Sequence, residues 1–272
     1  MTLQSKQNKL AKNLRELGGV AVAFSSGVDS TFLLKTAHDL LGDRTLAVTV
    51  QSCLSPQREL DEAVQFTKEN GIEHVVVDFD VFDIVGFTQN SANRCYLCKT
   101  ALFSRIRRIA EERRIPHVVE GSNADDSGDY RPGLLAIAEL GILSPLRETG
   151  LTKQEIRQLS CELGLPTWNK PSLACLASRI PYGEEITQER LAMIDKAEQY
   201  LLDVGFHQMR VRFHGNLARI ETDEEGFQRL LNKKLREEIH CRFKELGFVY
   251  IAVDLLGYRT GSMNYTLPYT TR

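Results

Sequence analysis

The chain has 272 residues, and its 34 basic and 36 acidic side chains give a formal net charge of −2. This near balance argues against a large basic surface for nucleic acid, and the lack of a long unbroken apolar run excludes a membrane-spanning helix. The amino-terminal residues lack the apolar core of a signal peptide, so a cytoplasmic protein is expected, in which the six cysteines serve as thiols or ligands rather than disulfides.

The first half of the chain alternates between strand and helix patterns. A leucine stripe predicts an amphipathic helix over residues 4–17, and the apolar run 19–24 predicts a buried strand followed by a helix that reaches Leu41. Ser55 and Pro56 predict the cap and the first position of the next helix. The remaining segments are predicted as strands at 46–50, 75–79 and 117–120 and as helices at 56–69 and 94–113. This order predicts a parallel α/β sheet with helices on both faces.

The turn between the first strand and its helix consists of small and hydroxyl residues and one carboxylate, over positions 25–30. Small residues let an anion approach the backbone, and the N–H groups and dipole of the following helix favour negative charge. The turn has no lysine and does not match the Walker sequence. Asp29 would repel phosphate unless it holds a magnesium ion or caps the helix. The alternative interpretation is an ordinary strand–helix turn.

The long polar loop of residues 120–133, which begins near Gly121, is expected at the same edge of the sheet, because ligands of parallel sheets bind at the carboxyl ends of the strands. Its acidic side chains are candidates for magnesium and its arginine for a phosphate or carboxylate, or the loop is merely solvated; these residues are Asp125, Asp126, Asp129 and Arg131. Lys153 lies in the first turn of a later helix that Thr152 and Glu155 are predicted to cap. The helix dipole disfavours a cation there, and a nearby anion would offset this penalty, although an exposed lysine in a first turn is also common.

The second half of the chain predicts a small α+β domain. Helices are expected at 190–204, 224–231 and 235–246, and strands at 207–213, 216–221 and 249–254. We expect domains at 1–166 and 187–272, joined by a linker at 167–186 that carries Cys175. The polar tail from Gly257 onward is expected to be partly disordered or to lie on a partner subunit. Arg210 and Arg212 alternate along one strand, so both can face a single anion, or both can be exposed strand residues.

Three cysteines attract attention. Cys95 and Cys98 form a C-x-x-C pair at the start of the helix at 94–113, beside Arg94 and Lys99. With Cys175 they fit a structural zinc site completed by a histidine such as His74 or His214, a redox pair that serves Cys175, or a three-thiolate iron–sulfur cluster with one open iron. The other cysteines are expected to be small buried hydrophobes; they are Cys53, Cys161 and Cys241.

Residues 25–30 (S-S-G-V-D-S) resemble the pyrophosphate loop S-G-G-x-D-S of the ATP pyrophosphatases. Ser26 stands where that family usually has its second glycine, and a positive φ there would cost a serine about 1 kcal/mol, so ATP affinity is the property affected. Two further motifs, G-S-N-A-D-D-x-x-D-Y-R-P-G and W-N-K-P-S-L-A-C-L-A-S-R-I-P-Y-G followed by Q-M-R-V-R-F-H, make most of the chain resemble the LarE family of sulfur transferases.

The LarE resemblance implies a PP-loop domain of the adenine nucleotide alpha-hydrolase type and synthesis of the nickel-pincer nucleotide. A carboxylate of a pyridinium dicarboxylate mononucleotide is adenylated by ATP with Mg²⁺, and sulfur then converts it to a thiocarboxylate. In one branch Cys175 gives up its own sulfur; in the other, three cysteines hold a 4Fe-4S cluster that carries sulfide. All three cysteines are present, which favours the cluster branch. The resemblance also implies a homo-oligomer and a small-molecule nucleotide substrate, and the sulfide donor stays unidentified. From the charge balance and the apolar pattern, no nucleic-acid or membrane partner is expected.

The same resemblance assigns site residues. Asp29 and Cys175 are expected to be catalytic, and Glu198 matches an acidic position near the substrate. The substrate phosphate is expected at Ser178, Arg179, Arg210 and Arg212, and the cluster at Cys95, Cys98 and Cys175. ATP is expected at Ser25, Ser26, Gly27, Asp29, Ser30, Gly121, Asp125, Arg131 and Lys153.

Three other functions are compatible with parts of this pattern. A tRNA thiolase would share the loop and the cysteines, but it should carry a basic RNA-binding surface. An amide-forming ligase would use the same adenylation with ammonia and would not need the three cysteines. A non-catalytic ATP sensor with a structural zinc would bind ATP without releasing AMP.

Overall fold

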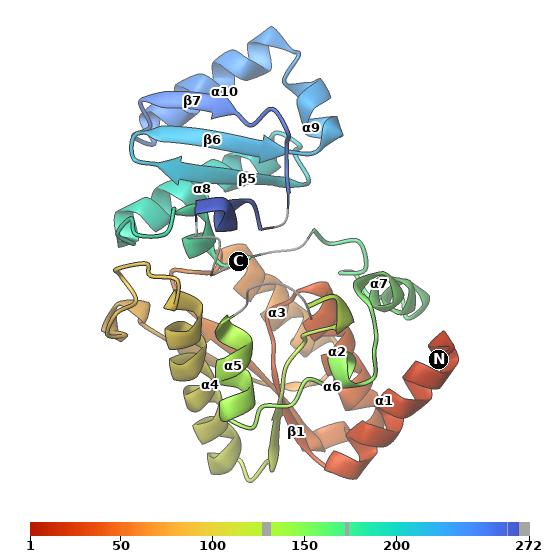
Figure 1. Ribbon diagram of the computed structural model, residues 1–272. Coiled ribbons are helices and arrows are strands. Elements are labelled where there is room, and N and C mark those ends of the chain that lie inside the picture. Colours follow the sequence, from red (N-terminus) through yellow and green to blue (C-terminus); the bar gives the residue numbers. More distant parts are fainter. Residues whose placement is uncertain (127–131, 172–173, 260, 267–272) are drawn as a thin grey trace. The chain divides into compact units, whose positions relative to one another are not determined.

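The computed structural model describes residues 1–126, 132–171, 174–259 and 261–266 (Figure 1). Contacts divide the chain into two compact units: the first is Met1–Ile84 with Cys95–Leu173, and the second is Val85–Arg94 with Ala174–Arg272. No helix among the described residues is long and apolar enough to cross a membrane. The functional division into an ATP domain, a linker and a substrate domain stays a prediction.

The first unit is built on a four-stranded parallel sheet, which confirms the predicted α/β class. Its strands lie in the order β3-β2-β1-β4, with β1 paired to both β2 and β4. Their bounds are β1 (Val20–Ala23), β2 (Thr45–Gln51), β3 (Glu73–Asp78) and β4 (His117–Val119). Leu143 extends the β4 edge through an isolated parallel bridge to Val119.

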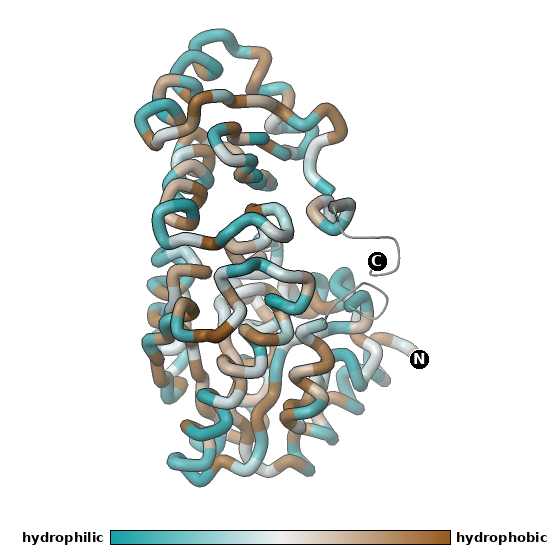
Figure 2. Tube along the Cα trace, turned by 60° about the vertical axis from the view of Figure 1, so that its left-hand side comes forward, coloured by the Kyte–Doolittle hydropathy of each residue, from teal (hydrophilic) through white to brown (hydrophobic). Residues whose placement is uncertain are grey.

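Helices of the first unit pack against both faces of this sheet. Along β1, Val20 and Val22 belong to one buried cluster and Ala21 to another, as the two-residue period of a strand requires. The first cluster takes side chains from α1 (Leu3–Leu17), α2 (Val28–Leu41), α3 (Gln57–Glu69), α6 (Pro145–Glu148) and α7 (Lys153–Glu162). The second takes them from α4 (Arg94–Glu112) and α5 (Pro132–Glu139). Along the helices, the tube in Figure 2 alternates between hydrophilic and hydrophobic segments.

Two local predictions are wrong. Pro56 is itself the cap of α3, with φ −58° and ψ 145°, and the helix begins at Gln57 rather than at the proline. The ring of proline fixes φ, but the extended ψ keeps Pro56 outside the helix. In addition, α5 begins at Pro132, inside the stretch expected to be loop up to residue 133, because a proline suits the first helical position.

The second unit is a small α+β layer, as its pattern predicts. Its sheet has the order β5-β6-β7, with β5 antiparallel and β7 parallel to β6. The strands are β5 (Met209–His214), β6 (Leu217–Thr222) and β7 (Tyr250–Val253), and the helices are α8 (Gln188–Asp203), α9 (Glu224–Arg229) and α10 (Lys233–Glu245). Short 3-10 helices, η4 (Leu176–Arg179) and η5 (Ser262–Thr266), complete it. Ser262 and Met263 are buried, so this part of the tail packs on its own unit.

Candidate active site

Hydroxyl groups shape the loop between β1 and α2. The backbone N–H of Ser25 donates to Ser30 Oγ over 3.3 Å, and that hydroxyl donates to the Gly27 carbonyl over 3.2 Å. Gly27 is the N-cap of α2, and none of the described side chains caps the helix. The start of α2 therefore presents backbone N–H groups and a partial positive charge, which suits an anion.

Ser26 adopts the positive φ that the family usually provides with a glycine at this position. Its φ is +49°, in the left-handed region where glycine is favoured, and its side chain is buried. A residue with a Cβ pays about 1 kcal/mol there. Ser26 Oγ donates to the Glu59 carbonyl in the first turn of α3 over 3.0 Å, and this bond offsets part of the cost.

The loop lies at the point where the strand order reverses. The chain passes from β1 to β2 and β3 on one side, whereas β4 pairs with the other side of β1. In open α/β sheets, ligands bind at this switch point. Gly121, just after β4, comes so close that a Cβ there would lie 3.1 Å from the Ser30 backbone nitrogen and 3.3 Å from Asp29 Cβ. A side chain at this position would press against the start of α2, so a glycine suits the point where the two loops meet.

Asp29 lies in a cluster of polar groups beside the loop. Its carboxylate pairs with the Lys153 ammonium and accepts a 3.4 Å hydrogen bond from the Asn123 amide. Burial raises the pKa of Asp29, although Lys153 opposes the shift. Asp125 accepts a 2.8 Å bond from the Lys153 backbone N–H, at the start of α7, where Thr152 and Glu155 form the predicted capping box. Asp29 does not cap α2, which removes one of the two roles considered for it.

Magnesium fits this environment. A carboxylate whose pKa is raised by burial is stabilised in its charged form by a nearby cation. Among the described residues, no group of three or more His, Cys, Asp or Glu side chains forms a metal site. Magnesium in nucleotide sites takes one or two carboxylates and completes its shell with phosphates and water, which is all that Asp29 needs to supply. Asp129 and Arg131 lie outside the described residues.

The cysteines of interest lie in different units. Cys95 in the first turn of α4 and Cys98 at the start of its second turn are half-buried, and Cys175 is exposed just before η4. Within the described part of the chain, all six cysteines are thiols. His74 uses both ring nitrogens on threonine hydroxyls, at 2.8 Å to Thr49 and 3.0 Å to Thr67, and is packed as a structural residue. His214 accepts a 3.2 Å bond from Arg219.

The prediction that the remaining cysteines are buried is wrong. Cys161 and Cys241 are exposed, and Cys53 is half-buried. The helices that carry the two exposed cysteines bury other positions: Ile156 and Leu159 on α7, and Ile239 and Phe243 on α10. The thiols lie on the opposite helix faces.

The second unit gathers the residues expected to hold the substrate phosphate. Arg179 is fully buried and donates two bonds to Glu198, at 2.9 and 2.8 Å. Its third nitrogen bonds Ser178 Oγ at 3.1 Å, and Arg212 bonds the Ser178 carbonyl at 3.1 Å. The guanidinium of Arg210 lies 5.0 Å from the centre of the Tyr258 ring. We call Ser178, Arg179, Arg210 and Arg212 the arginine cluster.

Two buried carboxylates, Glu198 and Glu221, offset part of the charge of the three arginines. Burial alone would raise the pKa of Glu198, but Arg179 and then Arg210 hold it below its usual value. Glu221, which is fully buried, accepts bonds of 2.9 and 2.7 Å from Arg212. Ser262 accepts a 2.9 Å bond from Arg212 and donates a 2.8 Å bond to Glu221. The cluster is therefore held rigidly by carboxylates before any anion arrives.

Sequence reasoning missed Glu221, Tyr258 and Ser262. Glu221 could have been found from the sequence, because a hairpin turn at Gly215 places it directly opposite Arg210 in the antiparallel register. Tyr258 and Ser262 had none, since the tail reaches the arginine cluster only through tertiary packing.

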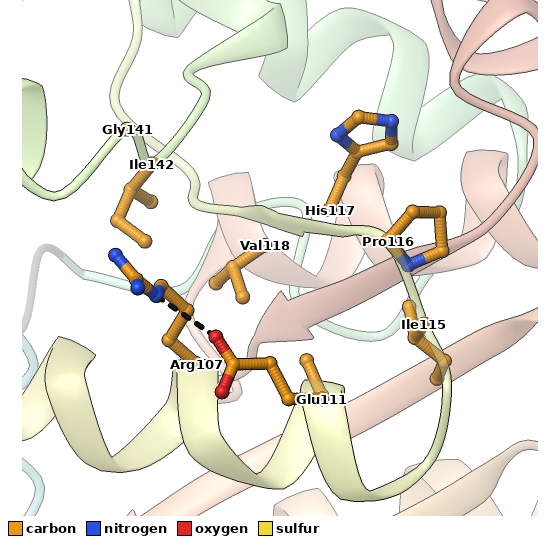
Figure 3. A pocket seen from close by; sticks show the side chains of 9 residues that line it. Arg107, Glu111, Ile115, Pro116, His117, Val118, Gly141 and Ile142 are labelled. Carbon is orange, nitrogen blue, oxygen red and sulfur yellow. Dashed lines mark hydrogen bonds and ion pairs between the residues drawn. The ribbon is translucent and has the colours of Figure 1, made fainter.

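A small pocket of about 160 Å³ lies at the opposite end of β4 from Gly121. Arg107 and Glu111 of α4, which form an ion pair, and His117 and Val118 of β4 are among the side chains that line it (Figure 3). Because the pyrophosphate loop follows the carboxyl ends of the strands and His117 begins β4, this pocket is not part of the candidate site.

No protein-family model matches the chain. It is 38% identical over 267 residues to the pyridinium-3,5-bisthiocarboxylic acid mononucleotide synthase of Lactiplantibacillus plantarum, a match that covers 98% of this chain and 96% of the relative. The chain belongs to the LarE family of this synthase.

This LarE-family chain is also similar to two further proteins, one full-length relative and one more distant enzyme subunit. It is 41% identical over 265 residues to an uncharacterized protein of Synechocystis, covering 97% of this chain and 99% of the relative. It is also 26% identical over 212 residues to a subunit of the glutamine-hydrolyzing GMP synthase of Archaeoglobus fulgidus, covering 69% of this chain and 66% of the relative. The family predicted from the motifs is thereby confirmed, and so is the PP-loop superfamily.

Proposed function

We propose that the chain is an ATP-dependent sulfur transferase that adenylates a carboxylate of a pyridinium dicarboxylate mononucleotide and converts it into a thiocarboxylate. The observation that carries this proposal is the 38% identity, along nearly the whole of both chains, to a synthase named for a bisthiocarboxylic acid mononucleotide. The glycine-assisted loop at the start of α2 supports ATP as the activating nucleotide.

Adenylation activates the carboxylate of the substrate for attack by sulfur. A carboxylate is a poor electrophile, because oxide would have to leave. One carboxylate oxygen attacks the α-phosphorus of ATP, and the bond to pyrophosphate breaks. A sulfur nucleophile then attacks the carbonyl carbon, and AMP leaves with the original oxygen. One oxygen of the substrate is thus exchanged for sulfur at the cost of one ATP.

The geometry suggests a role for each group of residues. The loop of Ser25 to Ser30 binds the pyrophosphate part of ATP through backbone N–H groups, with Gly121 leaving room beside it. Asp29 would hold Mg²⁺, which neutralises phosphate charge, and Lys153 would supply a second positive charge. The arginine cluster, held by Glu198 and Glu221, would bind the phosphate of the mononucleotide substrate.

The sulfur is proposed to come from the segment around Cys175. Cys95, Cys98 and Cys175 have the thiolate chemistry that an iron–sulfur cluster requires, and such a cluster would supply an iron-bound sulfide as the nucleophile. The alternative within the same function is loss of sulfur from Cys175 itself. The sulfide donor and the proposed homo-oligomeric state are open to direct measurement.

The function is tested by incubating the protein with ATP, Mg²⁺, sulfide and pyridinium-3,5-dicarboxylic acid mononucleotide. We expect AMP, pyrophosphate and a product whose mass reflects exchange of one oxygen for sulfur. Asp29→Asn should abolish AMP formation. Asp39→Asn, which changes an aspartate on the outer side of the same helix α2, should not. Absence of AMP from the wild-type protein under anaerobic conditions would refute the proposal.

The sulfur source is tested on anaerobically purified protein. A cluster predicts bound iron and charge-transfer absorption, both lost in Cys175→Ala and retained in Cys161→Ala, since Cys161 is an exposed thiol on α7. A sacrificial mechanism predicts no iron and loss of H₂S from Cys175 after one turnover.

The similarity to a GMP synthase subunit supports one other function, amide formation with ammonia after the same adenylation. This ligase would not need the three cysteines. Ammonia-dependent product that survives replacement of Cys95, Cys98 and Cys175 by alanine would favour it over sulfur transfer.

A further inference from the structure

Lys170 reaches back to the pyrophosphate loop. Its ammonium donates to the Ser26 carbonyl over 3.0 Å and to Ser26 Oγ over 3.2 Å, and it pairs with the Glu62 carboxylate of α3. The side chain is 15% exposed. An ammonium has three donors, and here each has an acceptor. Two of those acceptors belong to the single loop residue that has a positive φ.

The backbone of Lys170 is itself fixed. Arg157 of α7 donates to the Lys170 carbonyl over 2.7 Å and to the Trp168 carbonyl over 2.8 Å. The same helix begins with Lys153, which pairs with Asp29. The pyrophosphate loop is therefore held at two points by α7 and the segment after it, once at Ser26 and once at Asp29.

We propose that Lys170 is a positioning residue for ATP, which keeps Ser26 in the left-handed conformation that a glycine would adopt unaided. Ser26 pays a conformational cost that glycine does not. Lys170 stabilises the conformation by binding both the carbonyl and the hydroxyl of this residue. The peptide that follows Ser26 leads directly into Gly27 and the first N–H groups of α2, so releasing Ser26 would turn these donors away from the phosphates. This inference rests on the ATP binding in the proposed function.

The test is a double-mutant cycle on ATP binding, measured by titration calorimetry with ATP and Mg²⁺ and without carboxylate substrate. Lys170→Met should raise the Kd for ATP about tenfold, which is close to the value of a single hydrogen bond to a charged group. In the Ser26→Gly background the same change should raise it about threefold or less, because glycine needs no support. In turnover, KM for ATP should rise while kcat at saturating ATP changes less than about twofold.

Lys35→Met is the control. Lys35 of α2 also pairs with a carboxylate, that of Asp39, and among its described contacts none is to the loop or to the capping box of α7. We expect its ATP affinity to match the wild type. Lys170→Gln, which retains a donor without the charge, should restore part of the affinity if Lys170→Met proves too unstable to measure.

Equal loss of affinity with serine and with glycine at position 26 would overturn the proposal, as would wild-type affinity in Lys170→Met. Because ATP binding is read without the second substrate, failure to form a thiocarboxylate would refute the proposed function and leave this result standing.

Discussion

At the scale of single residues, the buried carboxylate of Asp29 destabilises the ligand-free fold. Burial favours its protonated form, so the charged carboxylate that the site needs is held at a cost. In the proposed function this carboxylate holds the Mg²⁺ that arrives with the phosphates of ATP, and the bound cation would stabilise its charged form.

Asp29→Asn should therefore raise the thermal midpoint of the ligand-free protein at about pH 8. For a carboxyl group whose pKa is raised on folding, the destabilisation is absent below its usual pKa, develops as pH rises, and is complete above the folded-state value. The gain should accordingly shrink as pH falls toward about 4. Scanning calorimetry across this range checks it, with Asp39→Asn as the surface control. A gain that does not depend on pH would contradict the charge argument.

Glu198 has the opposite shift and the opposite consequence. Its pKa is held below the usual value by Arg179 and Arg210 in spite of complete burial. Its stabilisation is thus present above the unfolded-state pKa and is lost as pH falls through the lower folded-state pKa.

Glu198→Gln should cost about 3–5 kcal/mol at neutral pH, because it leaves the buried Arg179 charge without a counter-charge. Urea unfolding measures the change. Glu238→Gln, an exposed glutamate on α10 paired with Lys234, should change stability by less than about 0.5 kcal/mol. The wild type should lose stability on acidification more steeply than Glu198→Gln, and equal slopes would show that Glu198 is not ionised in the fold.

At the scale of elements, α7 connects helix capping to the proposed ATP site. Its first turn carries Lys153, and the capping box of Thr152 and Glu155 fixes that turn. In the proposed function, Lys153 is the residue of this turn that contacts the nucleotide, and the capping box holds it in place.

Thr152→Ala should lower stability by about 1 kcal/mol and also raise KM for ATP, since the first turn of α7 frays. Thr187→Ala removes the equivalent N-cap hydroxyl of α8 and should cost similar stability without any change in KM for ATP. Urea unfolding and steady-state kinetics on the two variants separate the effects. Identical KM values would show that Lys153 is positioned by other contacts.

The described part of the tail is the second element with a functional consequence. Ser262 bridges Arg212 and Glu221. Ser262→Ala leaves two buried charged groups one hydrogen bond short, so KM for the mononucleotide should rise about tenfold while the Kd for ATP stays constant. Asn264→Ala in the same short helix should leave both constants unchanged. A rise in the Kd for ATP would place the tail in a different role.

At the scale of the whole molecule, the sheet, its order of strands and helices, and the family were predictable, because hydrophobic period and short motifs encode them locally. The site was predictable where the chain itself brings residues together, as at residues 25–30 and at the capping box of α7. It was not predictable where tertiary packing decides. Nothing in the sequence around Lys170 indicates that its side chain contacts Ser26. Cys241 is exposed because α10 buries Ile239 and Phe243 on its other face.

The division into two units predicts separate responses to the two substrates. Hydrogen exchange should slow in the loop and first turn of α2 when ATP and Mg²⁺ bind, and around η4 and β5 when the mononucleotide binds. Helix α9, which carries none of the proposed site residues, serves as the internal control. Protection of β5 by ATP alone would contradict the assignment of the mononucleotide phosphate to the arginine cluster.

The pairing of Ser26 with Lys170, separated by 144 positions, also restricts how such a sequence can evolve. Under the proposed role of Lys170, a mutation at position 170 should cost little ATP affinity while glycine occupies position 26. Once serine is fixed there, losing the lysine is expected to lower ATP affinity. The favoured order is therefore lysine first and serine second, and the reverse path must first restore glycine. The glycine-to-serine change at position 26 is therefore hard to reverse. It is nearly neutral while Lys170 is present, but it makes ATP binding depend on a lysine 144 positions away.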